Sequence, residues 1–167
     1  DVHQPMVSND LLRAVFLPVK FHQATRTIMV SDSVTFRAAE VRDLPGILEL
    51  IQPFVVARQL LPRTKVELEK LFEHGFVAEC NQELVAFCAI EIYSPKLAEI
   101  QCLAVATSQR NQGIGKNLIE RCISCARQEG VCELMAITAS ENVFQQCGFD
   151  YALPDQKRAL FIRLDDR

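Results

Sequence analysis

From residue 34 onward the chain alternates between short apolar runs, typical of strands, and stretches whose apolar positions recur every three or four residues, typical of helices. Asn81, Gln82 and Glu83 separate two of the apolar runs and predict a tight turn between antiparallel strands. The predicted strands cover residues 34–38, 76–80, 84–93, 98–107 and 132–138, and a last strand pair ends near 159–164.

Four segments have helical spacing, and they carry local start or stop signals. They are expected to begin at residue 43, at residue 64, at residue 115 with an end near 128, and at residue 141 with an end near 147. Asp43 is a candidate cap of the first helix, and Pro53 predicts where that helix ends. Thr64 and Glu67 form a capping-box pattern, and Gly130 has the position of a C-cap.

The predicted order, β-α-α-β-β-β-α-β-α-β-β, describes a mixed α/β fold. The hairpins predict antiparallel pairing, while the crossover helix 115–128 predicts that the strands on either side of it pair in parallel. With 167 residues, 49% of them hydrophobic, the chain can form one core. We therefore expect a domain over 34–167, preceded by an extension over 1–33 that is either a strand pair (14–19 with 27–30) or a linker.

Charge and cysteine content limit the class of protein. A net charge of −3 indicates neither nucleic acid nor an anionic membrane as the main partner. No apolar run approaches the roughly 18 residues that span a bilayer, and the segment 11–19 lacks the basic start of a signal peptide. The seven cysteines are an odd number in mostly apolar segments, which predicts reduced thiols in a cytoplasmic protein. The pair Cys122 and Cys125 has no second pair to complete a metal site, so no metal is expected.

The run 109–116 carries the clearest indication of chemistry, because it joins a predicted strand to a predicted helix. Backbone N–H groups at a helix start have no intrahelical acceptor, and the helix dipole adds positive potential, so an anion can bind there. Gly113 and Gly115 allow close approach to the backbone, and Arg110 and Lys116 add charge. An ordinary turn with two glycines is the alternative. The spacing matches neither a nucleotide P-loop nor a dinucleotide fingerprint, which would need a third glycine.

The remaining pattern, Arg-x-x-Gly-x-Gly at 110–115, resembles the acetyl-CoA pyrophosphate loop of the GNAT acyltransferase superfamily. A second motif, Asn-x-Phe-x-x-x-Gly-Phe at 142–149, is similar to the helix-then-Gly-Phe segment after that family's fifth strand. Within the family the chain is most similar to the acetyltransferase domain of bacterial N-acetylglutamate synthases and related amino-acid N-acetyltransferases. The stretches that carry this likeness are 36–39, 43–47, 61–64 and 98–105.

The resemblance implies the GNAT fold: a mixed, mostly antiparallel sheet that splays between strands 4 and 5, with about four flanking helices. It also implies direct transfer of an acetyl group from acetyl-CoA to the amine of a small acceptor, such as the amino acid glutamate, through a tetrahedral intermediate. Many relatives form homodimers, so a homodimer is expected here as well. The implied cofactor-binding residues are Cys102, Leu103, Ala104, Val105, Arg110, Asn111, Gln112, Gly113, Ile114, Gly115, Lys116, Asn142 and Phe144.

Two catalytic roles follow from the resemblance. The Leu103 N–H is the expected oxyanion donor, and Glu99 matches a family carboxylate that acts as general base through water. Glu91 is the reserve base, and a solvent-facing charge on a strand is the alternative interpretation of Glu99. The family's usual general acid is a tyrosine, but Phe144 occupies that position. The thiolate then leaves unaided, or water or Ser140 gives the proton.

Arg63 is the main candidate for acceptor binding, because it lies in the loop where the family builds its acceptor wall and its planar fork suits a carboxylate. A surface arginine is the alternative. Ser140 is the second candidate. The glutamate-binding relatives usually carry an arginine in the loop after strand 5, where this chain has Ala139. The departures at Ala139 and Phe144 motivate an alternative function, an acyl-CoA-sensing regulatory module without catalysis.

Overall fold

The computed structural model describes residues 33–151, which form a five-stranded sheet in the order β1-β2-β3-β4-β5. Strands β1 to β4 pair antiparallel, and β4 pairs with β5 in parallel across the crossover helix, which confirms the predicted mixed sheet. The predicted strand pairs 14–19 with 27–30 and near 159–164 lie outside the described residues. The strands are β1 (Val34–Ala38), β2 (Gly75–Cys80), β3 (Glu83–Ile92), β4 (Leu97–Val105) and β5 (Glu133–Ala136).

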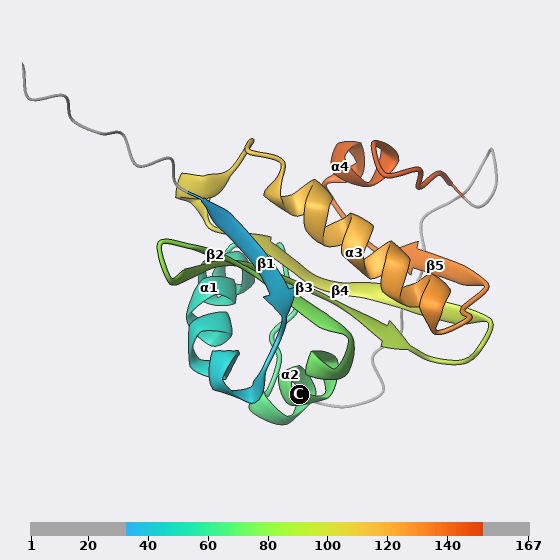
Figure 1. Ribbon diagram of the computed structural model, residues 1–167, viewed down its shortest axis with the longest axis horizontal. Coiled ribbons are helices and arrows are strands. Elements are labelled where there is room, and N and C mark those ends of the chain that lie inside the picture. The colour runs from blue at the N-terminus through green and yellow to red at the C-terminus, as the bar shows by residue number, and fades with distance from the viewer. Residues whose placement is uncertain (1–32, 152–167) are drawn as a thin grey trace, which may run out of the picture. The chain divides into compact units, whose positions relative to one another are not determined.

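Helices cover both faces of this sheet. In Figure 1, α3 crosses one face, and α1 and α2 pack on the other. None of the described helices is long and apolar enough to cross a membrane. The helices are α1 (Leu44–Val56), α2 (Lys65–Leu71), α3 (Ile114–Gln128) and α4 (Glu141–Gln145), with 3-10 turns at Val41–Asp43, Phe72–His74 and Thr107–Gln109.

Local signals account for several element boundaries. Thr64 and Glu67 form the predicted capping box at the start of α2. Gly130 has φ +71° and directly follows Glu129, the C-cap of α3, as a glycine that ends a helix does. Asn81 and Gln82 both have positive φ, and they make the two-residue turn between β2 and β3.

Pro53 does not end α1, contrary to the prediction. The helix continues to Val56, and the Ala57 N–H still donates to the Pro53 carbonyl at 3.0 Å. Proline removes only its own N–H from the helical ladder, and Pro53 lies on the exposed side of the helix. Burial of Ile47 and Ile51 on the opposite side holds the helix in place, so packing overrides the local signal.

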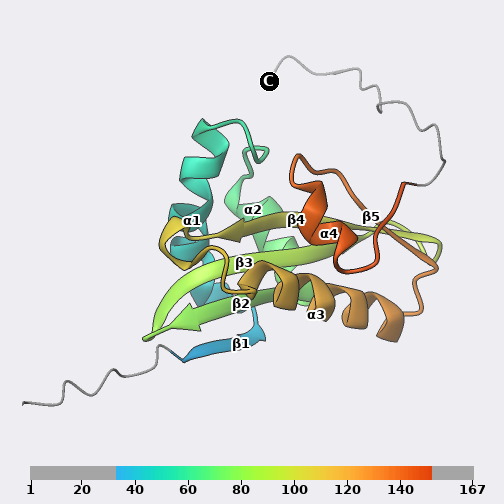
Figure 2. The same cartoon turned by 90° about the horizontal axis from the view of Figure 1, so that it is seen from above.

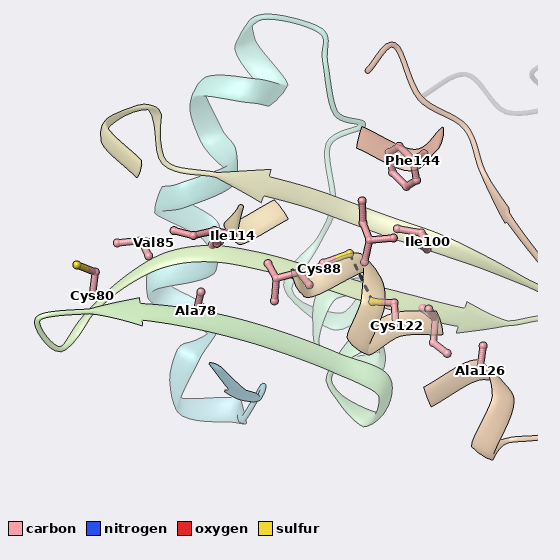
Figure 3. Packing of buried hydrophobic residues seen from close by; sticks show 13 residues of the cluster. Ala78, Cys80, Val85, Cys88, Ile100, Ile114, Cys122, Ala126 and Phe144 are labelled. Carbon is pink, nitrogen blue, oxygen red and sulfur yellow. Dashed lines mark hydrogen bonds between the residues drawn. The ribbon is translucent and has the colours of Figure 1, made fainter. Parts of the chain in front are cut away.

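Two apolar clusters anchor the helices. On the α3 side, Leu118, Ile119 and Cys122 are fully buried against the sheet, and the Cys122 thiol donates to the Cys88 sulfur at 3.5 Å (Figure 3). On the other side, α1 and α2 pack on Phe87, whose ring is completely buried. All seven cysteines are free, as predicted, and four of them are buried.

Strand β4 contains an irregularity that matters for the site. Phe87 pairs with Ala104 and Ala89 pairs with Gln101, so two residues of β4 stand opposite one residue of β3. Cys102, inside this bulge, has φ +56°, a left-handed conformation that costs an L-residue free energy. The extra residue places the side chains of Gln101 and Cys102 on the α1/α2 face in succession, instead of on alternate faces.

Asp43 precedes α1 as predicted, but its side chain does not cap that helix. The carboxylate accepts two hydrogen bonds from the Arg37 guanidinium, each 2.7 Å long, and one from the Glu40 N–H at 2.8 Å. Arg37 also pairs with Glu79 on β2. The Arg37 hydrogen bonds hold the pKa of the nearly buried Asp43 below its usual value.

Asp43→Asn is expected to lower the free energy of unfolding at pH 7 by about 2 kcal/mol, because the charged hydrogen bonds with Arg37 are lost. The pKa of Asp43 is lower in the folded state, so this contribution is complete above the unfolded value of 3.8 and is lost as pH falls through the folded value. Urea unfolding at pH 7 and at about pH 3 should show a smaller difference between the two proteins at the lower pH. Glu120→Gln, which removes an exposed pair with Lys116, is the control and should change stability by less than about 0.5 kcal/mol. Equal stability of Asp43→Asn and wild type at pH 7 would contradict this account.

Candidate functional site

A cleft of about 760 Å³ lies beside the sheet. The second half of β4 forms its floor, and its walls come from the loop into α3, the segment after β5 and the end of α1. Strand β4 pairs with β5 only over Leu97–Ile100, with Ile100 opposite Ala136. Beyond that point β4 continues to Val105, and residues 102, 103 and 105 line the cleft together with residues 137–140 from beyond β5. The cleft therefore begins where the two parallel strands part, as the predicted splay requires.

Most of the predicted cofactor-binding residues meet at this cleft, although they come from three separate segments. Ala104 is an exception, since its side chain is buried among the α1/α2 cluster on the other face of the sheet. Gln112 is exposed and does not line the cleft. The predicted residues that line the cleft are Cys102, Leu103, Val105, Arg110, Asn111, Gly113, Ile114, Gly115, Lys116, Asn142 and Phe144, together with the acceptor candidate Ser140.

The glycine loop has the geometry of an anion site. Gly113 has φ +78° and immediately precedes α3, and Asn111 is also left-handed, with φ +62°. Asn117 N–H donates to the Gly113 carbonyl at 3.0 Å, so the N–H groups of residues 114–116 form the first turn of the helix, where no intrahelical carbonyl precedes them. With the positive end of the helix dipole, these groups can bind a phosphate.

Positive side chains flank the loop. The Arg110 guanidinium lies 5.4 Å from the centre of the Phe54 ring on α1, which orients it along the cleft wall. This contact brings the loop beside α1 (Figure 2). Lys116 Nζ lies 3.8 Å from Glu120 one turn along α3. Both cations are at the end of the cleft where the helix begins, so a polyanion would be attracted there.

The opposite wall of the cleft is apolar. Phe144 is 5% exposed, and its ring makes an edge-to-face contact with Phe149 at 5.4 Å between centroids. Figure 3 shows Phe144 beside Ile100 of β4. Ser140 directly precedes α4, and its hydroxyl is the one hydroxyl among the predicted site residues of this segment. The apolar wall suits an alkyl chain better than a charged group.

Glu99 and Arg63 do not line the cleft, but a hydrogen-bonded chain links them on the α1/α2 face of β4. Arg63 Nη2 donates to Gln101 Oε1 at 2.6 Å, and Gln101 Nε2 donates to the Tyr93 hydroxyl at 3.2 Å. Tyr93 in turn donates to Glu99 Oε2 at 2.5 Å. Within residues 33–151, the Nε atom of Arg63 is buried without a hydrogen-bond partner, and the guanidinium also lies close enough to the Cys102 thiol to oppose the rise in its pKa.

Tyr93 and Gln101 are not among the site residues predicted from the sequence. The spacing of two along β4 indicates that Glu99 and Gln101 share a face, and this was the available signal. Tyr93 lies just after β3, where nothing local indicates a partner on the next strand. The cleft and the hydrogen-bonded chain of side chains both lie on β4. A group bound in the cleft at residues 102–105 would therefore be close to the polar face of the strand.

Burial sets the protonation state of the Cys102 thiol, which lies between the cleft and the hydrogen-bonded chain. Cys102 is among the residues that line the cleft, but its side chain packs in the α1/α2 cluster, where burial raises the pKa of its thiol above the usual value although the nearby Arg63 opposes this. The thiol therefore stays protonated near neutral pH and is a poor nucleophile. Within the described part of the chain, no group of three potential metal ligands comes together.

The chain shares sequence and fold with known acetyltransferases. Residues 44–149 match the acetyltransferase (GNAT) family. The chain is 33% identical over 137 residues to an amino-acid acetyltransferase of Pasteurella multocida, a match that covers 78% of this chain and 31% of that protein. It is also 33% identical over 116 residues to an uncharacterized N-acetyltransferase of Chlorobaculum tepidum, covering 68% of this chain and 73% of the relative. The chain thus spans about a third of the length of the amino-acid acetyltransferases it matches.

Solved structures are also similar to this chain in fold. The acetyltransferase region of N-acetylglutamate synthase from Neisseria gonorrhoeae, complexed with coenzyme A and L-arginine, has a TM-score of 0.62 at 30% identity, over 75% of this chain and 29% of that chain. A Mycobacterium tuberculosis protein solved with CoA has a TM-score of 0.64 at 25% identity, over 68% of this chain and 70% of that chain.

Gly113→Ala and Gly115→Ala are expected to differ in their effect on stability. Alanine at 113 would have to keep φ near +78°, which costs about 1–2 kcal/mol for an L-residue. Alanine at 115 would meet only Val105 Cγ2 at 3.6 Å, an ordinary contact, and alanine favours a helix over glycine. Urea unfolding should therefore show a loss of about 1 kcal/mol or more for the first variant and none for the second. Equal losses would mean that the loop does not hold residue 113 in the left-handed conformation.

Proposed function

This chain belongs to the acetyltransferase (GNAT) family, and on that premise we propose that its cleft binds acetyl-CoA and that the domain transfers the acetyl group to the amine of a small amino acid. The observation that carries the proposal is the position of the anion-binding loop 110–116 at one end of a cleft that opens where β4 and β5 part. The names of the relatives, amino-acid acetyltransferase and N-acetylglutamate synthase, support an amino acid as acceptor.

The residues of the cleft fit acetyl-CoA. The first turn of α3 and the cations Arg110 and Lys116 suit a pyrophosphate, and the apolar wall at Phe144 suits the chain that links it to the thioester. The backbone of β4 beyond Ile100 faces the gap left by β5, where an extended chain can pair with it as another strand would. Gln109 Oε1, which lines the cleft, is buried without a hydrogen-bond partner within the described residues, and a bound polar group would satisfy it.

Each step of the proposed reaction has a residue to support it. Acetyl-CoA supplies the acetyl group as a thioester, and the acceptor nitrogen attacks its carbonyl carbon. The Leu103 N–H, next to Cys102 in the bulge, would donate to the oxygen of the thioester carbonyl as negative charge develops on it. A fixed donor of this kind needs no reorganisation. Glu99 would take the amine proton through water. As the new C–N bond forms and the C–S bond breaks, the thiolate leaves and gains a proton from water or Ser140.

The acceptor would be held by its carboxylate. The buried, unpaired Nε of Arg63, next to the Nη2 that Gln101 already engages, supports a role in binding an anionic group. Ala139 occupies the place of an arginine common in the glutamate-binding relatives and lines the cleft without a charge. The side chain of the acceptor is therefore less constrained than in those relatives, and glutamate is one member of the proposed class. The free cysteines support the predicted cytoplasmic location, and the homodimer stays a prediction.

Thiol release from acetyl-CoA, measured with each amino acid separately and beside isothermal titration of acetyl-CoA, tests the proposal. We expect the cofactor to bind and thiol release to depend on an amino acid. Phe144, which has no hydroxyl and is packed against Phe149, favours the second candidate, a regulatory module that binds acyl-CoA without catalysis. Binding without release for any amine would support that module, and absence of binding would overturn the role of the loop.

Glu99→Gln is expected to lower kcat by about 100-fold, because a general base contributes on the order of 10²–10⁴. Its Kd for acetyl-CoA should stay unchanged, since Glu99 does not line the cleft. Steady-state thiol release and calorimetry measure the two quantities. Glu133→Gln, at an exposed position on β5, is the control and should keep full turnover. Full turnover of Glu99→Gln would remove Glu99 from the role of base.

Arg63→Ala is expected to raise the KM for the amino acid about 10- to 100-fold, because a charged hydrogen bond is worth about 1.5–3 kcal/mol. The KM for acetyl-CoA should change little. Arg58→Gln, an exposed arginine in the same loop, is the matched control for charge. If both variants raise the acceptor KM equally, the effect comes from the overall potential and not from a contact with Arg63.

A further inference from the structure

We propose that Tyr93 is a positioning residue for Glu99: its hydroxyl fixes the carboxylate of the proposed base and links it to the acceptor-binding Arg63. This inference rests on the proposed function. It adds Tyr93, directly after β3, and Gln101, on β4, to the residues that the reaction needs.

The geometry leaves one arrangement for the hydroxyl. Tyr93 lies just after β3, and its oxygen donates to Glu99 Oε2 at 2.5 Å while it accepts from Gln101 Nε2 at 3.2 Å. The amide of Gln101 is oriented because its own oxygen accepts from Arg63. Since Gln101 can give Tyr93 only an N–H, the phenol proton must point to a carboxylate. Engaging Oε2 leaves Glu99 Oε1 to accept the proton of the incoming amine through water.

A second carboxylate makes this hydroxyl necessary. Glu91 is the direct cross-strand partner of Glu99, so two like charges face each other on one side of the sheet. Without a donor between them, the two side chains would move apart. The Tyr93 oxygen is 3.5 Å from Glu91 Oε2, a longer contact than the one to Glu99, so the phenol lies between the two and is drawn to Glu99.

Tyr93 keeps its proton under the conditions of the reaction. Burial and the hydrogen bond to Glu99 raise the pKa of the phenol above its usual value, and both carboxylates add to the effect. The hydroxyl is thus a constant donor that holds the base without itself taking up or releasing a proton. Half of the side chain is exposed, so the phenyl ring contributes little to the core.

The hydrogen-bonded chain also links the two residues proposed to bind the two ends of the acceptor. Arg63, in the α1–α2 loop, would hold the carboxylate of the amino acid, and Glu99 would face its amine. Gln101 and Tyr93 are the only two side chains between them in the chain of hydrogen bonds that the structure describes. Gln101 is 8% exposed and has both ends of its amide paired, so it can hold a fixed spacing between the guanidinium and the base.

Tyr93→Phe tests the proposal, because it removes the hydroxyl and keeps the ring. We expect kcat to fall about 10-fold, the effect of one hydrogen bond of about 1.4 kcal/mol, with the Kd of acetyl-CoA unchanged. Tyr151→Phe is the matched control. Tyr151 is the second tyrosine of the chain, is about equally exposed, and donates to Glu141 at 2.6 Å. The control should keep the wild-type kcat.

A double-mutant cycle separates positioning from a structural or an independent role. If Tyr93 acts through Glu99, Tyr93→Phe should lower kcat in the wild-type background and have no further effect in Glu99→Gln. Losses that multiply would overturn the proposal, since Tyr93 would then act apart from Glu99. A wild-type kcat for Tyr93→Phe would also overturn it. If Glu99→Gln itself keeps full turnover, the proposed role of Glu99 as base is contradicted. That result is distinct from one in which Glu99→Gln loses turnover and only the role of Tyr93 is contradicted.

Discussion

One extra residue in β4 determines the arrangement of the whole site. Two residues of β4 stand opposite one residue of β3, and Cys102 takes a left-handed conformation there. The bulge interrupts the alternation of side chains just after the last residue of β4 that pairs with β5, Ile100. Gln101 and Cys102 consequently share the α1/α2 face, and Leu103 faces the cleft. The backbone cost of Cys102 is met by the packing of the strands around it, which is how strained residues persist at functional sites.

The anion-binding loop depends on this framework. Its N–H donors are useful only if they keep their direction, and that direction is set by α3. Leu118, Ile119 and Cys122 are fully buried under α3, so the first turn of the helix cannot tilt without losing this contact. Gly113 then closes the loop with a conformation that other residues adopt at a cost. Donors held in this way need little reorganisation when an anion binds.

In the proposed function, β4 separates two different environments. The cleft side combines backbone donors, cations and an apolar wall, as a long amphiphilic cofactor needs. The α1/α2 side carries two carboxylates, a phenol, an amide and a guanidinium in one hydrogen-bonded chain. A thioester and an amine would thus approach from opposite sides of one strand. The buried amide of Gln101 is tolerated because both of its ends are paired.

The sequence by itself determined the parts of this protein whose physics is local. The order of strands and helices from residue 34 to residue 145, the capping box at Thr64, the turn at Asn81 and the glycine loop at 110–116 depend on neighbours in sequence, and the structure has each of them. The predicted end of α1 at Pro53 was wrong, because burial of Ile51 outweighs the local effect of the proline. The hydrogen-bonded chain from Arg63 through Gln101 and Tyr93 to Glu99 was decided by the tertiary structure alone. Its members come from β4, from the end of β3 and from the α1–α2 loop, and only the register of the sheet and the packing of that loop bring them together.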